Sequence, residues 1–266
     1  MKTLKLHNHT IHTEDTMETP MKLRVHIAPV GFELDRIIIP AKEMRADKVW
    51  LIGHSNFSED DARPFLDKVQ KTLKKNNIEV KVSTANRFKL FDIVKTVKEI
   101  IYEEKENKNE IYLNVASGSK IHSVGLMMAC MIFDERTDIH PFYAQAKKYL
   151  HTKVSEPQTT GIKEIHHLPT YQIMTPKYEH LLALKIINEN GGKINKKDMA
   201  EKAEDAKLVI VNARPNNFSQ ARFASLDKNI ISPLEKNWKY IVIKKVGRNR
   251  WIHLTDEGKY ACEFLI

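Results

Sequence analysis

One stretch, residues 110–133 (EIYLNVASGSKIHSVGLMMACMIF), restricts the possible folds more than any other part of the sequence. Residues 111–115 are apolar and have the length of a strand, and residues 121–133 are apolar almost all round at helical length. A strand and a helix of this kind must both be buried, so the stretch predicts a strand–turn–helix unit inside an α/β domain. The polar turn, residues 116–120, would place N–H groups, hydroxyls and one lysine at a helix N-terminus, which favours an anion.

The rest of the N-terminal half repeats this alternation. Expected strands cover residues 23–28, 48–52, 78–83 and 139–144, and expected helices cover residues 33–42, 58–75 and 89–105. Ser58 and Asp61 predict a capping box for the second of these helices. The alternation is typical of a mostly parallel sheet covered on both faces, and residues 149–154 and 162–168 are expected to complete it as an antiparallel hairpin.

Ligands bind outside the carboxyl ends of the strands in such folds. The loops expected there are residues 29–32, 53–56, 84–87 and 116–120. Small and polar residues gather in these loops, so this edge of the sheet is the expected ligand site.

The C-terminal part has a different pattern. Expected helices cover residues 177–190, 196–205 and 216–228, expected strands cover residues 240–245 and 251–254, and a last helix ends near residue 264. Thr175-Pro176 and Asn195 are expected to begin the first two helices, Asn229 to end the third in a left-handed conformation, and Thr255 to begin the last. Helices followed by a basic hairpin describe a winged helix-turn-helix. The segment of residues 206–215 is longer than the usual turn, so the sequence does not decide which helix enters the DNA groove.

We therefore divide the chain into a flexible N-terminal extension (1–20), a Rossmann-like sensing domain (21–168), a linker (169–176) and a winged helix-turn-helix domain (177–266). The extension contains His7, His9 and His12, but the further His and Asp clusters that a phosphoesterase metal site needs do not follow in order. No metal site is predicted.

The net charge of this 266-residue chain is +9, which favours a polyanionic partner. The two cysteines, Cys130 and Cys262, lie in apolar surroundings and are expected to be buried free thiols. No apolar run reaches transmembrane length and no signal peptide is recognisable, so we expect a cytoplasmic protein that does not contact membranes.

Two motifs resemble a known family. Residues 114–120 (NVASGSK) are similar to the second signature of CARF domains, the Rossmann-like sensors attached to CRISPR systems, and residues 29–36 (PVGFELDR) are similar to the first. Residues 142–144, the hairpin and the Leu168-Pro169 exit are also similar. The resemblance runs from about residue 23 to the end and is greatest to the CARF–winged-helix regulators. Ala116 and Ser119 stand where threonine is frequent in the family.

The resemblance implies a cyclic oligoadenylate ligand, most often the four-nucleotide ring, held across a CARF homodimer without a cofactor or metal. A phosphate ring with two-fold symmetry suits two copies of one helix N-terminus, and the apolar far side of the 121–133 helix would supply the dimer surface. The expected ligand-binding residues are Pro29, Val30, Gly31, Phe32, His54, Ser55, Asn56, Asn114, Ala116, Ser117, Gly118, Ser119, Lys120 and His122.

Double-stranded DNA is the second expected partner, at promoters of CRISPR-Cas or other defence genes. The third C-terminal helix carries side chains that read base edges, and the hairpin carries cations that hold phosphates. The expected DNA-binding residues are Asn217, Ser219, Gln220, Arg222, Ser225, Lys228, Lys244, Lys245, Arg248, Asn249 and Arg250. The alternative is a solvated basic face.

The sequence thus predicts a ligand-responsive DNA-binding transcriptional regulator and no enzyme. The alternative is a slow, metal-independent ring nuclease that uses the ring's own 2′-hydroxyl, with a winged helix that serves only for dimerisation. Lys120, Ser117 and His54 are the candidate catalytic residues for that case. A sensor of another nucleotide and a plain strand-to-helix turn without a ligand are the remaining interpretations.

Overall fold

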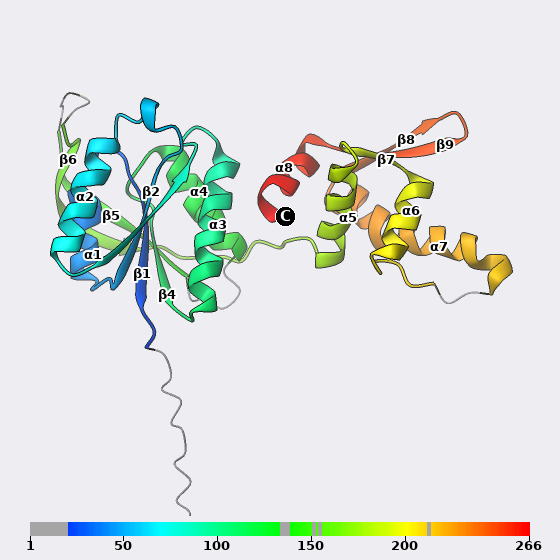
Figure 1. Cartoon of the computed structure of the whole chain (residues 1–266), viewed down its shortest axis with the longest axis horizontal. Coiled ribbons are helices and arrows are strands. Elements are labelled where there is room, and N and C mark those ends of the chain that lie inside the picture. The colour runs from blue at the N-terminus through cyan, green and yellow to red at the C-terminus, as the bar shows by residue number, and fades with distance from the viewer. Residues whose placement is uncertain (1–20, 134–138, 151–152, 154–155, 212–213) are drawn as a thin grey trace, which may run out of the picture.

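The structure, a computed structural model, describes residues 21–133, 139–150, 153, 156–211 and 214–266 (Figure 1). The expected N-terminal extension with its three histidines lies outside the described residues. The N-terminal domain contains β1 Arg24–Pro29, α1 Asp35–Glu43, β2 Lys48–His54, α2 Arg63–Lys75, β3 Glu79–Ala85, α3 Leu90–Glu106, β4 Glu110–Asn114, α4 Lys120–Phe133, β5 Ile139–Tyr149 and β6 Thr159–His167. The C-terminal domain contains α5 Tyr178–Glu189, β7 Lys193–Asn195, α6 Lys196–Asp205, α7 Phe218–Leu226, β8 Ile241–Val246, β9 Asn249–Leu254 and α8 Asp256–Leu265.

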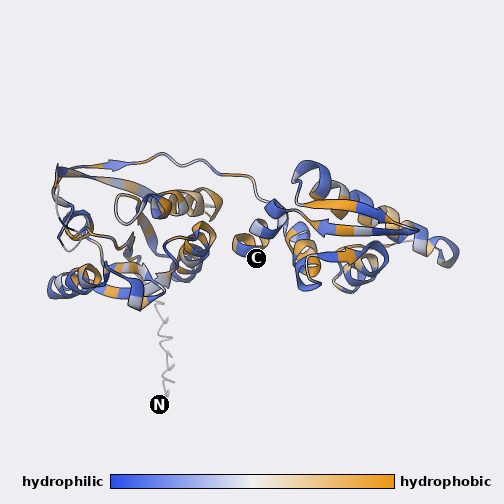
Figure 2. Cartoon of the chain, turned by 90° about the horizontal axis from the view of Figure 1, so that it is seen from above, coloured by the Kyte–Doolittle hydropathy of each residue, from blue (hydrophilic) through white to orange (hydrophobic). Residues whose placement is uncertain are grey.

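The N-terminal domain is a three-layer α/β sandwich. Its sheet has the order β3-β2-β1-β4-β5-β6, and all neighbours are parallel except the antiparallel pair β5–β6. Alternate residues of β1 and β2 face two separate cores, one under α1 and α2 and one under α3 and α4 (Figures 1 and 2). All seven residues of β2 are buried, as expected for a strand covered on both faces. The expected fold class is confirmed.

The helix α4 differs from the expectation that it is buried all round. Its inner side does pack closely, since a Cβ on Gly125 would lie only 2.9 Å from Cγ2 of Ile93 in α3. Its outer side exposes 40% of Ile121 and 50% of Val124 to solvent. The apolar outer positions of α4 therefore need an explanation other than the core of this chain.

The expected hairpin of residues 149–154 and 162–168 is only half right. The strand β5 continues without a break to Tyr149 and itself forms the first arm, which pairs with β6 from Phe142↔His167 to Tyr149↔Thr159. The first arm is therefore not a separate strand that begins at Tyr149, because Tyr149 is the last residue of β5. Most of residues 151–155 lie outside the described ranges.

Two expected helix starts are wrong. Asn56, not Ser58, caps a short turn at Phe57–Glu59, and α2 begins at Arg63. The helix α5 begins after Lys177 with no side-chain cap, so Thr175 does not cap it. Before α2, the side chains of Asn56 and Asp60 accept from the Ser58 and Ala62 amides, so a short turn precedes the helix.

The C-terminal domain is a winged helix, as predicted. The helices α5, α6 and α7 pack against a sheet of order β7-β9-β8, whose short first strand was not predicted. Asn195 caps α6 and Thr255 caps α8 through side-chain oxygens, as expected. Asn229 does not end a helix: wider helical turns at Asp227–Ile231 and Pro233–Asn237 continue α7. The Asn229 carbonyl is instead 3.0 Å from His180 Nε2 in α5.

The two domains are joined by residues 168–177, which form neither helix nor strand. The Ile173 amide donates a hydrogen bond of 2.9 Å to the Met131 carbonyl in α4. Cys130 and Cys262 are both buried and not joined in a disulfide, as predicted. Among the described helices, none combines the length and the apolar character that a membrane crossing requires.

Candidate functional site

The two signature loops meet backbone to backbone at the carboxyl edge of the sheet. A Cβ on Gly31 would lie 3.1 Å from the Gly118 Cα, and a Cβ on Gly118 would lie 2.9 Å from the Pro29 Cβ. Gly118 also has a φ of +77°, a left-handed conformation that side chains disfavour. Gly118 therefore requires glycine, Gly31 packs tightly against it, and the structure brings these two predicted loops together.

Asn114, the last residue of β4, holds the loop of residues 116–120 in place. Its Nδ2 donates to the Arg36 carbonyl at 2.7 Å, and its Oδ1 accepts from the Ala116 amide at 3.0 Å. It is 1% exposed, so it shapes the turn and does not face a ligand. Val30 and Phe32 are likewise directed inward, since both pack in the core under α1 and α2.

The side chains of the turn itself are divided between interior and surface. Ser117 is fully buried, and its hydroxyl has no hydrogen-bond partner within the described ranges. Ser119 and Lys120 are exposed at the first turn of α4. The exposed ammonium of Lys120 thus stands at a helix N-terminus, where backbone N–H groups also favour an anion.

His122 is a buried neutral imidazole under the turn. Its Nδ1 lies 3.1 Å from the Ser119 amide, which donates to it, and 2.9 Å from the Ser119 hydroxyl. Burial lowers the pKa of His122 to about 4, together with a smaller effect from the charges of Arg87 and His54. A neutral acceptor at Nδ1 agrees with this direction, so His122 orients Ser119 and carries no charge near neutral pH.

The loop after β3 supplies a cation that the predicted residue set lacks. The Arg87 amide donates to His54 Nδ1 at 3.4 Å, and the Arg87 guanidinium pairs with the buried carboxylate of Asp60. Phe88 is 72% exposed and packs edge-on against His54. Residues 84–87 were expected at this edge, so an arginine in such a loop was the available signal.

The three candidate catalytic residues differ in access. His54 is 2% exposed, with its Nδ1 3.3 Å from the Ala85 carbonyl, and Ser117 is fully buried. Only Lys120 lies at the surface. In the described part of the chain, no group of three or more His, Cys, Asp or Glu side chains is placed to hold a metal ion. The loop after β2 adds exposed Ser55 and Asn56, and the latter caps its own turn.

The predicted DNA-reading residues do not all face outward. Asn217, Ser219, Gln220 and Lys228 are exposed, but Arg222 Nη1 pairs with Glu204 Oε2 in α6 at 2.8 Å. Ser225 Oγ accepts from Asn229 Nδ2 at 3.2 Å. Arg222 therefore joins two helices of the domain, and the exposed set is confined to the two ends of the helix.

The wing presents a continuous basic end. Lys245 pairs across the strands with Arg250, Val246 pairs with Asn249, and Gly247 turns the chain with a φ of +61°. All five predicted wing residues, Lys244, Lys245, Arg248, Asn249 and Arg250, are exposed. In Figure 2 the strands β8 and β9 change from apolar to hydrophilic toward this end. A basic, unburied hairpin of this kind suits a phosphate backbone.

Comparison with known proteins matches two separate parts of the chain. A family model described as "HFX_2341_N:-like, N-terminal" matches residues 24–149, and the "DUF6293 C-terminal winged helix domain" matches residues 179–266. The uncharacterized protein MJ1513 of Methanocaldococcus jannaschii is 29% identical over 191 residues, which cover 64% of this chain and 57% of that protein. The chain thus spans little more than half the length of this relative.

Two solved structures are similar to this chain at low identity and with TM-scores below 0.5. Csm6 of Enterococcus italicus, bound to cyclic hexa-2'-fluoro-hexa-dAMP, has a TM-score of 0.37 and 13% identity over 82% of this chain and 56% of its own. Can2 of Sulfobacillus thermosulfidooxidans, in complex with cyclic tetra-adenylate, has a TM-score of 0.36 and 11% identity over 91% of this chain and 63% of its own.

Proposed function

We propose that this chain, which has the architecture of a CARF–winged-helix protein, is a DNA-binding transcriptional regulator that responds to a cyclic oligoadenylate. The observation that carries the proposal is the glycine-packed turn at the start of α4, which leaves Lys120 exposed at a helix N-terminus. The exposed basic wing in the same chain would bind the DNA. Cyclic tetra-adenylate is the preferred ring, from the resemblance of the two signature motifs.

A homodimer completes the proposed site. Ile121 and Val124 are large apolar residues, exposed on α4 directly beside Lys120. Burying them against a second copy would remove apolar surface from water and place two Lys120 side chains near one two-fold axis. A ring of phosphates with the same symmetry would then contact both helix N-termini.

Replacing Lys120 with alanine is expected to weaken binding of the ring about tenfold, which corresponds to about 1.4 kcal/mol for a lost charge-assisted contact. Calorimetric titration with cyclic tri-, tetra- and hexa-adenylate measures this directly. Lys74→Ala removes the same charge at the far end of α2 and should leave the affinity unchanged. If no ring binds at micromolar concentrations, or if Lys120→Ala binds as well as the wild type, the sensing part of the proposal is wrong.

Removing two wing cations, in Arg248→Ala/Arg250→Ala, is expected to weaken DNA binding at all sequences. The slope of log affinity against log salt is negative, and each lost phosphate contact reduces its magnitude by about 0.9. Fluorescence anisotropy with duplex DNA at several salt concentrations gives both quantities. The control Lys71→Ala/Lys74→Ala removes the same net charge from α2. An unchanged slope in the wing variant would show that the basic wing does not contact DNA phosphates and is only a solvated basic surface.

The ring-nuclease alternative gains no support from the site geometry. Ser117 and His54 are buried, and the neutral His122 is engaged with Ser119. Lys120 alone would stabilise charge at a ring phosphate. Incubation of the protein with labelled ring in EDTA, followed by a search for linear products, distinguishes the nuclease from the regulator.

A further inference from the structure

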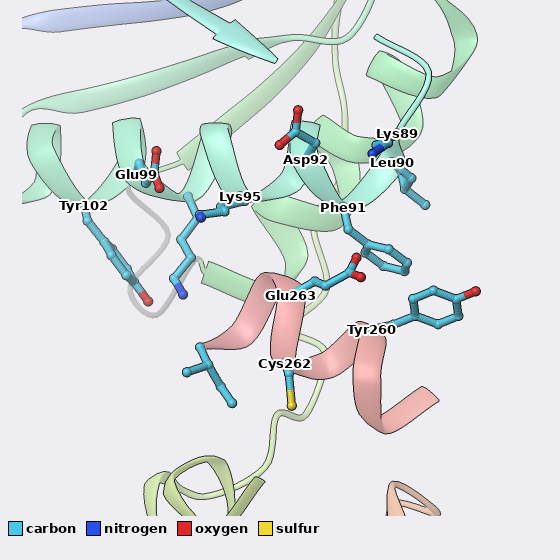
Figure 3. A pocket seen from close by; sticks show the side chains of 12 residues that line it. Lys89, Leu90, Phe91, Asp92, Lys95, Glu99, Tyr102, Tyr260, Cys262 and Glu263 are labelled. Atoms are coloured by element: carbon cyan, nitrogen blue, oxygen red, sulfur yellow. The ribbon is translucent and has the colours of Figure 1, made fainter. Parts of the chain in front are cut away.

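The helix α8 belongs to the winged helix but packs on the N-terminal domain. The ring of Phe91, in the first turn of α3, stacks on Tyr260 at 4.9 Å and on Phe264 at 5.1 Å between ring centroids. Figure 3 shows Phe91 and Tyr260 facing each other across the two helices. Phe264 and Leu265 also pack against the core under α3 and α4. In the described part of the chain, this aromatic contact joins side chains of the two domains directly.

A cation from α3 holds the end of α8. Lys98 Nζ donates to the Phe264 carbonyl at 3.4 Å and to the Leu265 carbonyl at 3.1 Å. The last carbonyls of a helix lack partners within the helix and carry partial negative charge, so a lysine there is favourable. The contact therefore has a polar component that fixes where α8 sits along α3.

The N-terminal end of α3, which carries Phe91, is also joined to the proposed ligand site. The Asn86 amide donates to Asp92 Oδ2 at 2.6 Å, which ties the loop of Arg87 to the residue next to Phe91. The Arg87 amide bonds to His54. Gly125 lets α4, whose first residue is Lys120, press closely on Ile93 of α3. A shift at either loop thus reaches α3 through direct contacts.

The beginning of α8 is joined to the wing. The Thr255 hydroxyl donates to the Lys239 carbonyl at 2.8 Å, and the Thr255 amide donates to the Tyr240 carbonyl at 2.9 Å. Gly258 is pressed so closely on Tyr240 that a Cβ would lie 2.1 Å from its carbonyl oxygen. Residues 239–240 lead directly into β8, which carries Lys244 and Lys245. A movement of α8 therefore carries the base of the wing with it.

We propose that α3 transmits ligand binding to the winged helix through the stack of Phe91 on α8. The proposal rests on the proposed function and names the route by which the ligand site regulates DNA binding. The linker makes a weaker connection, since residues 168–177 form no regular structure. A cavity of about 990 Å³ beside the stack, lined by Tyr102, Tyr260 and Cys262 among others, gives α8 room to change its position (Figure 3). Packed contacts of this kind switch between discrete arrangements.

The test compares the ligand's effect on DNA affinity in full-length variants. We expect saturating cyclic tetra-adenylate to change the wild-type DNA dissociation constant by a factor in the range of about 5 to 150, as is typical of allosteric coupling. Phe91→Ala should reduce this factor toward one, while its affinity for the ring stays within about twofold of the wild type. Tyr260→Ala removes the other side of the stack at a residue that is 47% exposed and so is safer for folding.

The matched control is Tyr178→Ala, which removes an aromatic that is 71% exposed at the start of α5. It should retain the wild-type factor. Thermal unfolding checks that Phe91→Ala and Tyr260→Ala are folded. If both folded variants also retain the wild-type factor, the route through α8 is wrong, while the proposed function as a regulator is unaffected. If the wild type itself shows no response to the ring, the proposed function fails, and the route fails with it.

Discussion

Replacing Glu104 with alanine is expected to lower the free energy of unfolding by about 3–5 kcal/mol, the usual loss when one partner of a buried ion pair is removed. Glu104, in α3, is fully buried, and its carboxylate accepts from Lys48 Nζ at 3.1 Å and from Trp50 Nε1 at 2.6 Å. Asn109 Nδ2 donates to it at 2.7 Å. Three donors from β2 and the α3–β4 loop would therefore lose their acceptor together.

The neighbouring Glu103 provides a matched control. It also pairs with a lysine of the sheet, Lys81, at 2.7 Å, but the two side chains are 45% and 39% exposed. Glu103→Ala should therefore cost no more than about 1 kcal/mol. Urea-induced unfolding, followed by circular dichroism, measures both variants. Equal losses for Glu103→Ala and Glu104→Ala would show that the buried cluster does not hold this end of the sheet.

A paired replacement separates the loss of the contact from the cost of a stranded charge. Lys48→Met/Glu104→Leu removes both charges and leaves side chains of similar size. It should recover most of the stability that Glu104→Ala loses, since an apolar pair in place of a buried ion pair is often nearly neutral. A double variant as unstable as Glu104→Ala would assign the effect to packing of the Glu104 side chain.

Acidification to about pH 5 is expected to cost about 4 kcal/mol of stability, about 2 kcal/mol for each of two buried histidines. Burial lowers the pKa of His26 to about 4, with a smaller effect from the charge of Arg24, and His122 has the same pKa for the reasons above. The Nε2 of His26 has no partner among the described residues, and Tyr112 and Phe142 pack on its ring.

Stability falls on acidification because the unfolded chain takes up protons before the folded chain does. The unfolded chain protonates these imidazoles near 6.5, whereas the folded chain resists protonation until about 4. The unfolded state therefore binds more protons in this window, and stability falls as the pH falls through it. Hydrogen bonds to Glu104 outweigh burial and lower the pKa of its carboxyl, so its contribution is lost at still lower pH.

Thermal unfolding as a function of pH tests the histidine contribution. His26→Asn and His122→Asn should each make stability less dependent on pH over this window, with His26→Asn leaving the ligand turn intact. If stability falls as steeply with decreasing pH in both variants as in the wild type, groups other than these two histidines cause the acid sensitivity.

The alternation of strands and helices could be read from the sequence because it is a local property. The apolar run of residues 111–115 and the helical run of residues 121–133 each carry their own periodicity. The right-handed connection of parallel strands then brings the exit loops to one edge of the sheet. The contact of Gly31 with Gly118 requires in addition that β1 and β4 are neighbours in the sheet, which the alternation alone does not decide.

Burial and partner choice could not be read in this way. Asn114, Ser117 and His122 are polar residues in or beside the polar turn, yet the structure buries all three. Arg222 is spaced like a base-reading residue but pairs with Glu204 from the preceding helix. Nothing in the local pattern marks these outcomes, because each depends on what another segment presents at that point.

The sequence by itself therefore determined the two domains, the glycine-dependent turn and the basic wing, since these arise from local periodicity, backbone conformation and charge. Only the tertiary structure decided that Lys120 is the exposed side chain of the candidate catalytic set, and that Arg87 in the loop after β3 forms an ion pair with Asp60. It also decided that α8 stacks on Phe91, which lies far from it in the chain. Such contacts form when distant segments share one space, and their energies depend on mutual burial that no single segment encodes.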